Sequence, residues 1–137
     1  MAKANRTANC TAAEARVRAR TATAYLDVAL IVLDEQSRDE FLNVAGGLAV
    51  LAGIAASDAI CCTRLGHRYR GDDHRGAADL LRTAAPDGAR LATTLTRLLD
   101  LKDEAHYGVM VVSTGKARNA VKWATTLVER AAEEIQR

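Results

Sequence analysis

A single proline, Pro86, interrupts a chain of 137 residues that is otherwise rich in helix formers. Proline most reliably ends or kinks a helix, so a chain with only one can form long helices over most of its length. Ala, Leu, Val and Thr supply most apolar positions, and aromatic residues make up only 4% of the chain. The length suits one domain with its own core. We therefore expect an all-α fold, with residues 1–10 as a flexible N-terminal segment and residues 11–137 as a single helical-bundle domain.

Two capping patterns predict where the first helices begin. Thr11 and Glu14 match the T-x-x-E capping box, in which each side chain accepts a backbone N–H at a helix start. The first helix is expected from about residue 12 to Gln36. Ser37 and Glu40 repeat the pattern, so a second helix should begin at once. Gly66 is expected to end the second helix, and Asp72 or Asp73 to cap a short third helix that runs to about Ala84. Pro86 suits the first turn of a fourth helix, and Ser113 or Thr114 is expected to cap a fifth. This order predicts an antiparallel bundle of four long helices plus one short helix.

Apolar spacing predicts which helix faces are buried. The first helix has an apolar band at Val17, Ala24, Val28 and Ile31, widened by Leu26, Ala29, Leu30 and Leu33. The second has one at Phe41, Val44, Leu48, Leu51, Ala55, Ala59 and Cys62. Gly46, Gly47 and Gly53 lower helix propensity there but allow a neighbouring helix to come close. Residues 43–62 are the longest apolar run, and Asp58 within them favours a buried helix over a membrane span, so no membrane partner is expected.

The stretch LLDLKDEAHYG, residues 98–108, is the first candidate site. At 100° per residue, Lys102 and His106 lie on or beside the inward face of the fourth helix, and a Lys there needs a partner or a path to water. In a structural interpretation Lys102 reaches solvent and His106 is a hydrogen-bonded core imidazole. In a functional one they are catalytic residues that face a cleft or a second subunit and meet a phosphate or a 2′-hydroxyl, with Asp58 as counter-charge for Lys102.

The loop GHRYRGDDHRG, residues 66–76, is the second candidate. Arg68 and Arg70 could grip phosphate and Tyr69 could stack on a base, although the charges could also simply cancel in a solvated loop. If this loop packs near the end of the fourth helix, Arg68 or Arg70 would add a cation beside His106. The expected substrate- or phosphate-binding residues are Arg68, Arg70, Asp58 and Tyr107.

The three cysteines and three histidines give weaker signals. Cys61 and Cys62 are adjacent and unsuited to bridge each other, Cys10 stands apart, and the basic N-terminus lacks the apolar segment of a signal peptide. We therefore predict reduced cysteines and a cytoplasmic protein. No recognised metal-ligand spacing occurs, so neither a metal nor another cofactor is expected. The net charge of +2 is too small to indicate a dedicated nucleic-acid binder by itself.

The order of segments, the AHYG that closes the fourth helix before a capped fifth, and the stretch SDAICCTRLGHRYRGDDH together resemble the HEPN superfamily of helical bundles, particularly small actinobacterial members. The resemblance covers roughly Thr11 to Gln136. It implies a metal-independent ribonuclease in which four to six intervening residues separate an Arg from a following His, often paired across a dimer. His106 matches that His, but residues 99–101 are Leu, Asp and Leu, and Lys102 is too close to replace the Arg.

The resemblance therefore implies a non-catalytic HEPN-like module that binds RNA, a nucleotide or a partner protein. A toxin–antitoxin or defence context is expected, and relatives pair with a minimal nucleotidyltransferase. A homodimer is expected from the family and from the small-residue helix faces. The alternatives are a metal-independent ribonuclease that uses His106 with Lys102 or a loop Arg, and a purely structural interaction protein.

Overall fold

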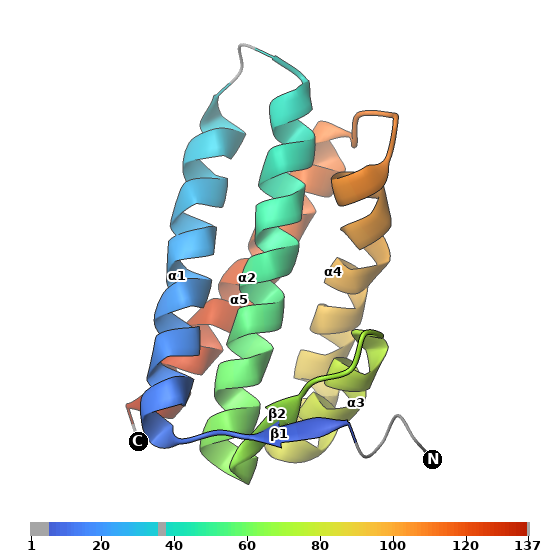
Figure 1. Ribbon diagram of the computed structural model, residues 1–137. Coiled ribbons are helices and arrows are strands. Elements are labelled where there is room, and N and C mark those ends of the chain that lie inside the picture. Colours follow the sequence, from blue (N-terminus) through green and yellow to red (C-terminus); the bar gives the residue numbers. More distant parts are fainter. Residues whose placement is uncertain (1–5, 36–37, 137) are drawn as a thin grey trace.

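Five helices and two short strands make up the computed structural model, which describes residues 6–35 and 38–136 (Figure 1). In chain order these are β1 (Thr7–Asn9), α1 (Ala12–Asp34), α2 (Glu40–Leu65), β2 (His67–Tyr69), α3 (Arg75–Ala84), α4 (Gly88–Tyr107) and α5 (Thr114–Ile135). The helical bundle of four long helices and one short one is thus confirmed. The pair of strands was not predicted.

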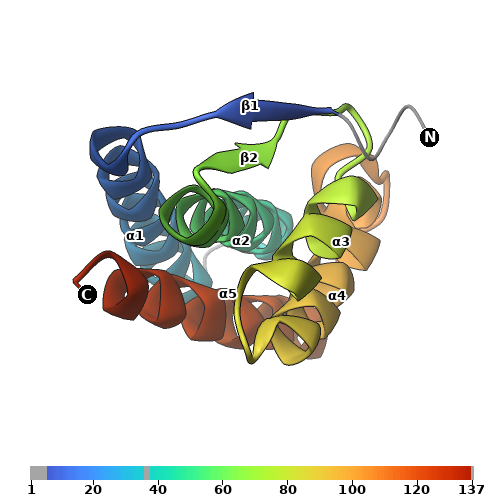
Figure 2. The same cartoon turned by 90° about the horizontal axis from the view of Figure 1, so that it is seen from below.

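Helix α2 is the central element of the bundle. It packs against all four other helices, and α1 and α4 run antiparallel to it on either side (Figure 1). Seen from below, α5 closes the bundle on the side of α2 that is opposite to the strands (Figure 2). Helix α2 is long and apolar enough to cross a membrane by length and composition, but 78% of its most apolar window is buried inside the bundle. The predicted buried helix is therefore the core of this fold.

Three of the predicted helix termini are formed by the expected groups. Thr11 Oγ1 accepts the Glu14 N–H at 3.1 Å and Glu14 Oε1 accepts the Thr11 N–H at 2.8 Å, which completes the capping box. Gly66 ends α2 with φ of 77°, a left-handed conformation that suits glycine. Ser113 Oγ caps α5 by accepting the Lys116 N–H at 3.1 Å. Side-chain oxygens satisfy backbone N–H groups that a helix start leaves without partners.

Two other starts need correction. Helix α2 begins at Glu40, after Asp39, and Asp39 makes no side-chain capping bond; Ser37, the predicted cap, lies outside the described residues. Helix α4 begins at Gly88 rather than around Pro86. The Gly88 N–H donates to the Ala85 carbonyl at 2.9 Å, so Pro86 lies in a turn that precedes the helix.

Helix α1 turns its smaller apolar residues inward, so its predicted apolar band is only partly buried, with Leu26 and Ala29 inside as expected. Its buried side chains are Ala15, Ala19, Ala22, Leu26 and Ala29. The predicted inner residues Val17, Val28 and Ile31 are instead exposed, with Ile31 at 69%. The predicted face of α2 is wrong only in its first half, where Val44 is exposed, whereas Ala55, Ala59 and Cys62 are buried as expected. Alanines allow α1 to approach α2 closely, and the larger residues then lie on the outside.

The glycines of α2 have the predicted role of admitting a neighbour, which is α4. A Cβ on Gly46 would lie 3.5 Å from Ala105 Cβ, and a Cβ on Gly53 would lie 2.5 Å from Leu98 Cδ1. A Cβ on Gly47 would lie 2.6 Å from the ring of His106. These three positions therefore set the separation of α2 and α4 along much of their contact.

Part of the N-terminal segment that was predicted to be flexible is a strand. Residues Thr7–Asn9 pair antiparallel with His67–Tyr69, and the Arg70 N–H donates to the Arg6 carbonyl at 2.8 Å (Figure 2). Because α1 and α2 are antiparallel, the chain before α1 and the chain after α2 emerge side by side. They can then satisfy each other's backbone groups.

Candidate binding site

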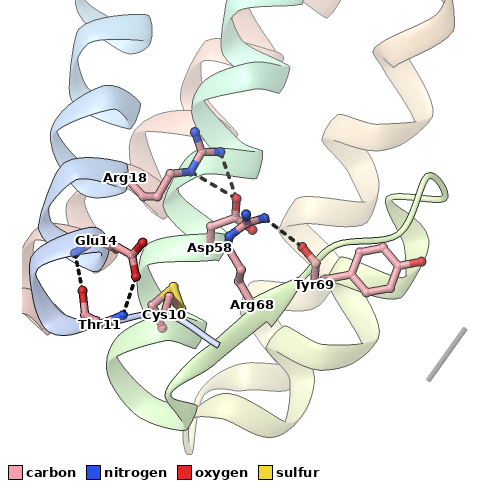
Figure 3. The surroundings of a disulfide bond; sticks show 8 residues. Cys10, Thr11, Glu14, Arg18, Asp58, Arg68 and Tyr69 are labelled. Carbon is pink, nitrogen blue, oxygen red and sulfur yellow. Dashed lines mark hydrogen bonds and ion pairs between the residues drawn. A yellow bond between two sulfur atoms is a disulfide. The ribbon is translucent and has the colours of Figure 1, made fainter. Parts of the chain in front are cut away.

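A pocket of about 460 Å³ lies between α1, α2 and the strand pair. Its lining residues are Asn9, Cys10, Glu14, Val17, Arg18, Asp58, Cys62 and Arg68. Figure 3 shows several of these side chains, and the lining as a whole comes from β1 and the residue after it, from α1, from α2 and from β2. Four chain segments that are far apart in the sequence therefore build one polar pocket, and two of its residues, Asp58 and Arg68, belong to the predicted binding set.

Asp58 is the buried charge of this pocket. It is 7% exposed within the Ala-rich run of α2, and its Oδ2 accepts hydrogen bonds from Arg18 Nη2 at 2.9 Å and Nε at 3.2 Å. Burial raises the pKa of Asp58, and the positive charges of Arg18 and Arg68 act in the opposite direction. Burying a carboxylate without a cation costs free energy because the charge loses its water, and the ion pair with Arg18 offsets this cost. Asp58 is therefore not the counter-charge of Lys102, which corrects that prediction.

Arg68 contributes the second guanidinium of the pocket. Its Nη1 donates to the Tyr69 carbonyl at 3.5 Å, and its charge lies near enough to Asp58 to lower the pKa of that carboxyl (Figure 3). Two guanidiniums thus flank one carboxylate, while the Glu14 carboxylate is occupied by the capping box of α1. An arginine pair around an accessible pocket is suited to a phosphate or carboxylate, because each guanidinium has several N–H donors in a plane.

A disulfide between Cys10 and Cys62 lies in the wall of the pocket (Figure 3). The prediction that the cysteines are reduced is therefore wrong for these two residues. The antiparallel arrangement of α1 and α2 brings Cys10, just before α1, next to Cys62 in the last turn of α2, with the Cys10 N–H donating to Gly66. Cys61 remains a buried free thiol, and burial raises its pKa to about 12, which makes it a poor nucleophile. The cytoplasmic location stays a prediction.

The predicted catalytic pair is elsewhere. His106 Nε2 lies 3.1 Å from the carbonyl oxygen of Gly47, and since a carbonyl can only accept, this nitrogen carries the proton. Lys102 lies one turn away and is close enough to His74 to lower the pKa of that imidazole. Gly47 and Gly66 are at opposite ends of α2, roughly 28 Å apart at about 1.5 Å per residue. Arg68 and Arg70 therefore do not add a cation beside His106 within one chain.

The other predicted residues do not join the pocket. Tyr107 is 73% exposed at the His106 end of the bundle, where its ring meets the His106 ring edge-on. Arg70 is exposed just after β2 and does not line the pocket. Tyr69, the predicted stacking ring, is buried and packs over Gly71 and Gly76. Within residues 6–35 and 38–136, no group of three or more His, Cys, Asp or Glu side chains is placed to hold a metal ion.

Sequence reasoning did not assign Arg18, Glu14 or the two bridged cysteines to a binding site. One signal was available for Arg18, since a buried Asp58 requires a cation from a neighbouring helix. Residues 18 and 58 face each other when two antiparallel helices, the first ending near residue 34 and the second starting near residue 40, are joined by a short connection. No protein-family model matches the chain, and no curated protein matches it either.

Proposed function

We propose that this protein is a non-catalytic, HEPN-like binding module that takes a phosphate-bearing ligand, a nucleotide or an RNA end, in the pocket beside the disulfide. The observation that carries the proposal is the pair of guanidiniums, Arg18 and Arg68, at one pocket with the buried Asp58 between them. Asp58 holds Arg18 in place, which reduces the entropy that the side chain would lose on binding. Arg68 is less constrained and is the residue that a ligand phosphate would recruit.

The position of His106 supports a role in binding rather than in catalysis. A ribonuclease needs a general acid or base beside a cation that stabilises charge on the phosphate. His106 uses Nε2 on a backbone carbonyl, and the cation nearest in sequence is Lys102, which lacks the planar fork of an arginine. The proposal includes a partner protein or a toxin–antitoxin context only because the sequence resembles the HEPN superfamily.

Calorimetric titration tests the proposal with ATP, AMP, inorganic phosphate and a short RNA that carries either a 5′-phosphate or a 5′-hydroxyl. We expect phosphate-dependent binding that Arg68→Ala weakens about tenfold or more, the loss typical of a charge-assisted hydrogen bond. Arg70→Ala is the matched control, because it removes the same charge two residues away but outside the pocket lining. Absence of binding by all of these ligands, or equal losses in the two variants, would contradict the proposal.

The ribonuclease alternative has one observation in its favour. Lys102 precedes His106 by one helical turn on α4, and its charge also acts on His74, which directly precedes α3. The test is to measure RNA cleavage in EDTA by the wild-type protein and by the variants His106→Ala and Lys102→Ala. Cleavage that survives chelation and disappears with His106→Ala would replace the binding proposal by a metal-independent nuclease.

A further inference from the structure

Helix α1 carries a second apolar face that nothing in the described chain covers. Its buried face is formed by alanines and Leu26, whereas Val17, Ala24, Val28 and Ile31 point the other way and are exposed. At 100° per residue these four residues and Thr21 fall within a band of about 80°, roughly opposite the buried face. We call these five residues the outer stripe of α1. An apolar band of this length on a solvent-facing helix is typical of a contact surface.

The spacing of the outer stripe is that of a coiled-coil seam. Residues 17, 21, 24, 28 and 31 alternate in steps of four and three, which is the heptad pattern of the a and d positions. Small residues, Thr21 and Ala24, lie at its centre, and valines flank them. In an antiparallel pairing of two such helices, Val17 of each would pack on Val28 of the other, and Thr21 on Ala24. The valines then meet each other, the small central pair lets the helices come close, and Ile31 lies beyond them, opposite Glu14 of the other copy.

Charges beside the outer stripe point to a second copy of this chain as the occupant. Arg20 and Asp27 are exposed, lie one heptad apart on the same edge of the stripe, and form no ion pair with any residue of the described ranges. In the antiparallel pairing above, Arg20 of each copy faces Asp27 of the other. The twofold axis thus generates two equivalent ion pairs.

The same charges select the register. A shift of the pairing by one heptad would place Asp27 of one copy against Asp27 of the other, and a shift in the opposite direction would place Arg20 against Arg20. Like charges in such positions disfavour both alternatives. Apolar complementarity and charge complementarity therefore agree on a single arrangement.

We propose that two copies of this chain form an antiparallel dimer through the outer stripe of α1, with reciprocal Arg20–Asp27 pairs across the twofold axis. Val17 belongs both to the stripe and to the rim of the pocket. Each pocket therefore lies beside α1 of the second copy, although the dimer does not depend on what the pocket binds.

Sedimentation velocity over a range of protein concentrations, at low ionic strength, tests this dimer. Arg20→Asp and Asp27→Arg should each raise the dimer Kd about tenfold or more, because each replaces two attractions by two repulsions. The double variant R20D/D27R restores opposite charges in swapped positions, so its Kd should return to within a few fold of the wild-type value.

Lys122→Asp is the control, since it makes the same change of charge at an exposed position of α5, outside the stripe. It should leave the Kd unchanged, and circular dichroism should show the helical signal of every variant intact. A wild-type protein that stays monomeric at all concentrations would overturn the proposal. So would a dimer whose Kd is insensitive to the single reversals, or one that the double variant fails to restore.

Discussion

Gly53 lets α4 approach α2 at the centre of the core, where Leu98 and Leu127 fill the space a side chain would need. A Cβ there would lie 2.5 Å from Leu98 Cδ1 and 3.3 Å from Leu127 Cδ1, and both leucines are fully buried. We expect Gly53→Ala to lower the free energy of unfolding by about 1–3 kcal/mol, despite the better helix propensity of alanine, because an overfilled core cannot relax freely. Urea unfolding measures this. Gly115→Ala is the control, since a Cβ there meets nothing closer than 4.0 Å and should be neutral or slightly stabilising.

His74 gives the stability a pH dependence of defined sign. Burial and the charge of Lys102 lower its pKa below the ordinary histidine value of about 6.5, against the opposing effect of Asp73 and Asp72. The unfolded state then binds a proton more readily than the folded state. Stability is therefore full above about pH 6.5 and declines as pH falls toward the folded pKa. We expect a decline below about 1 kcal/mol, since the half-exposed ring is screened by solvent.

The His74 effect is measured as the difference in unfolding free energy between pH about 7.5 and about 5.5, in the wild type and in His74→Gln. Glutamine keeps the polarity and approximate size but cannot titrate. The decline should be smaller in the variant, and an identical decline in both proteins would show that His74 is not its source.

At the scale of elements, Glu134 and Arg130 of α5 together link α5 to α2 and to the start of α4. Glu134 is 1% exposed near the end of α5, and its Oε1 accepts from Arg64 on α2 and from Arg130, which also donates to Asp87 before α4 at 2.9 Å. Arg130 accordingly lowers the pKa of Asp87. Glu134→Ala should lower the free energy of unfolding by about 2–4 kcal/mol, because the mostly buried guanidiniums of Arg64 and Arg130 lose the carboxylate that both use as acceptor. Thermal or denaturant unfolding measures this loss. Glu133→Ala, one position away and exposed, should cost a small fraction of that; similar losses would contradict the role given to Glu134.

Helix boundaries were largely predictable from sequence, but the burial of α1 was not. The capping box at Thr11 and Glu14, the stop at Gly66 and the cap at Ser113 are local interactions between residues close in the chain, so their patterns carry over into the structure. Burial depends on which other element covers a face. Helix α1 has two apolar faces, and the face with larger side chains at Val17, Val28 and Ile31 gives the stronger sequence signal. Close packing of alanines against α2 determined which face turned inward.

For the molecule as a whole, the topology determined which predicted site residues came together. Asp58 and Arg68 meet because α2 ends directly before β2, whereas His106 and Tyr107 lie at the far end of the antiparallel α4. The residue types alone do not indicate that Asp58 and Arg68 lie at one end of the bundle and His106 and Tyr107 at the other. The pairing of Arg18 with Asp58 requires the register of α1 against α2, which depends on the length of both helices and of the turn between them. The sequence therefore indicated two of the eight residues that line the pocket, Asp58 and Arg68, but not how the helices and strands bring the eight together.

The disulfide cross-links the chain at the end of the bundle where α1 begins and α2 ends. It joins residues 52 apart, ties β1 to the last turn of α2 and forms part of the pocket wall. A cross-link that closes a loop of this size restricts the unfolded chain, which corresponds to about 3–4 kcal/mol in the chain-entropy account. We expect reduction by a phosphine to lower the thermal midpoint markedly, and C10S/C62S to match the reduced protein. Thiol labelling in denaturant should find one reactive cysteine before reduction and three after it.

The variant Cys61→Ser separates the disulfide from the neighbouring thiol. It removes the buried free thiol but leaves the bridge in place, so its midpoint should still fall on reduction, whereas the midpoint of C10S/C62S should not respond. If reduction left the thermal midpoint of the wild type unchanged, the strand pair and the helix contacts would be sufficient to stabilise this end of the bundle without the disulfide. Since the chain before α1 contributes only Asn9 and Cys10 to the pocket, loss of the bridge should weaken phosphate binding less than Arg68→Ala does.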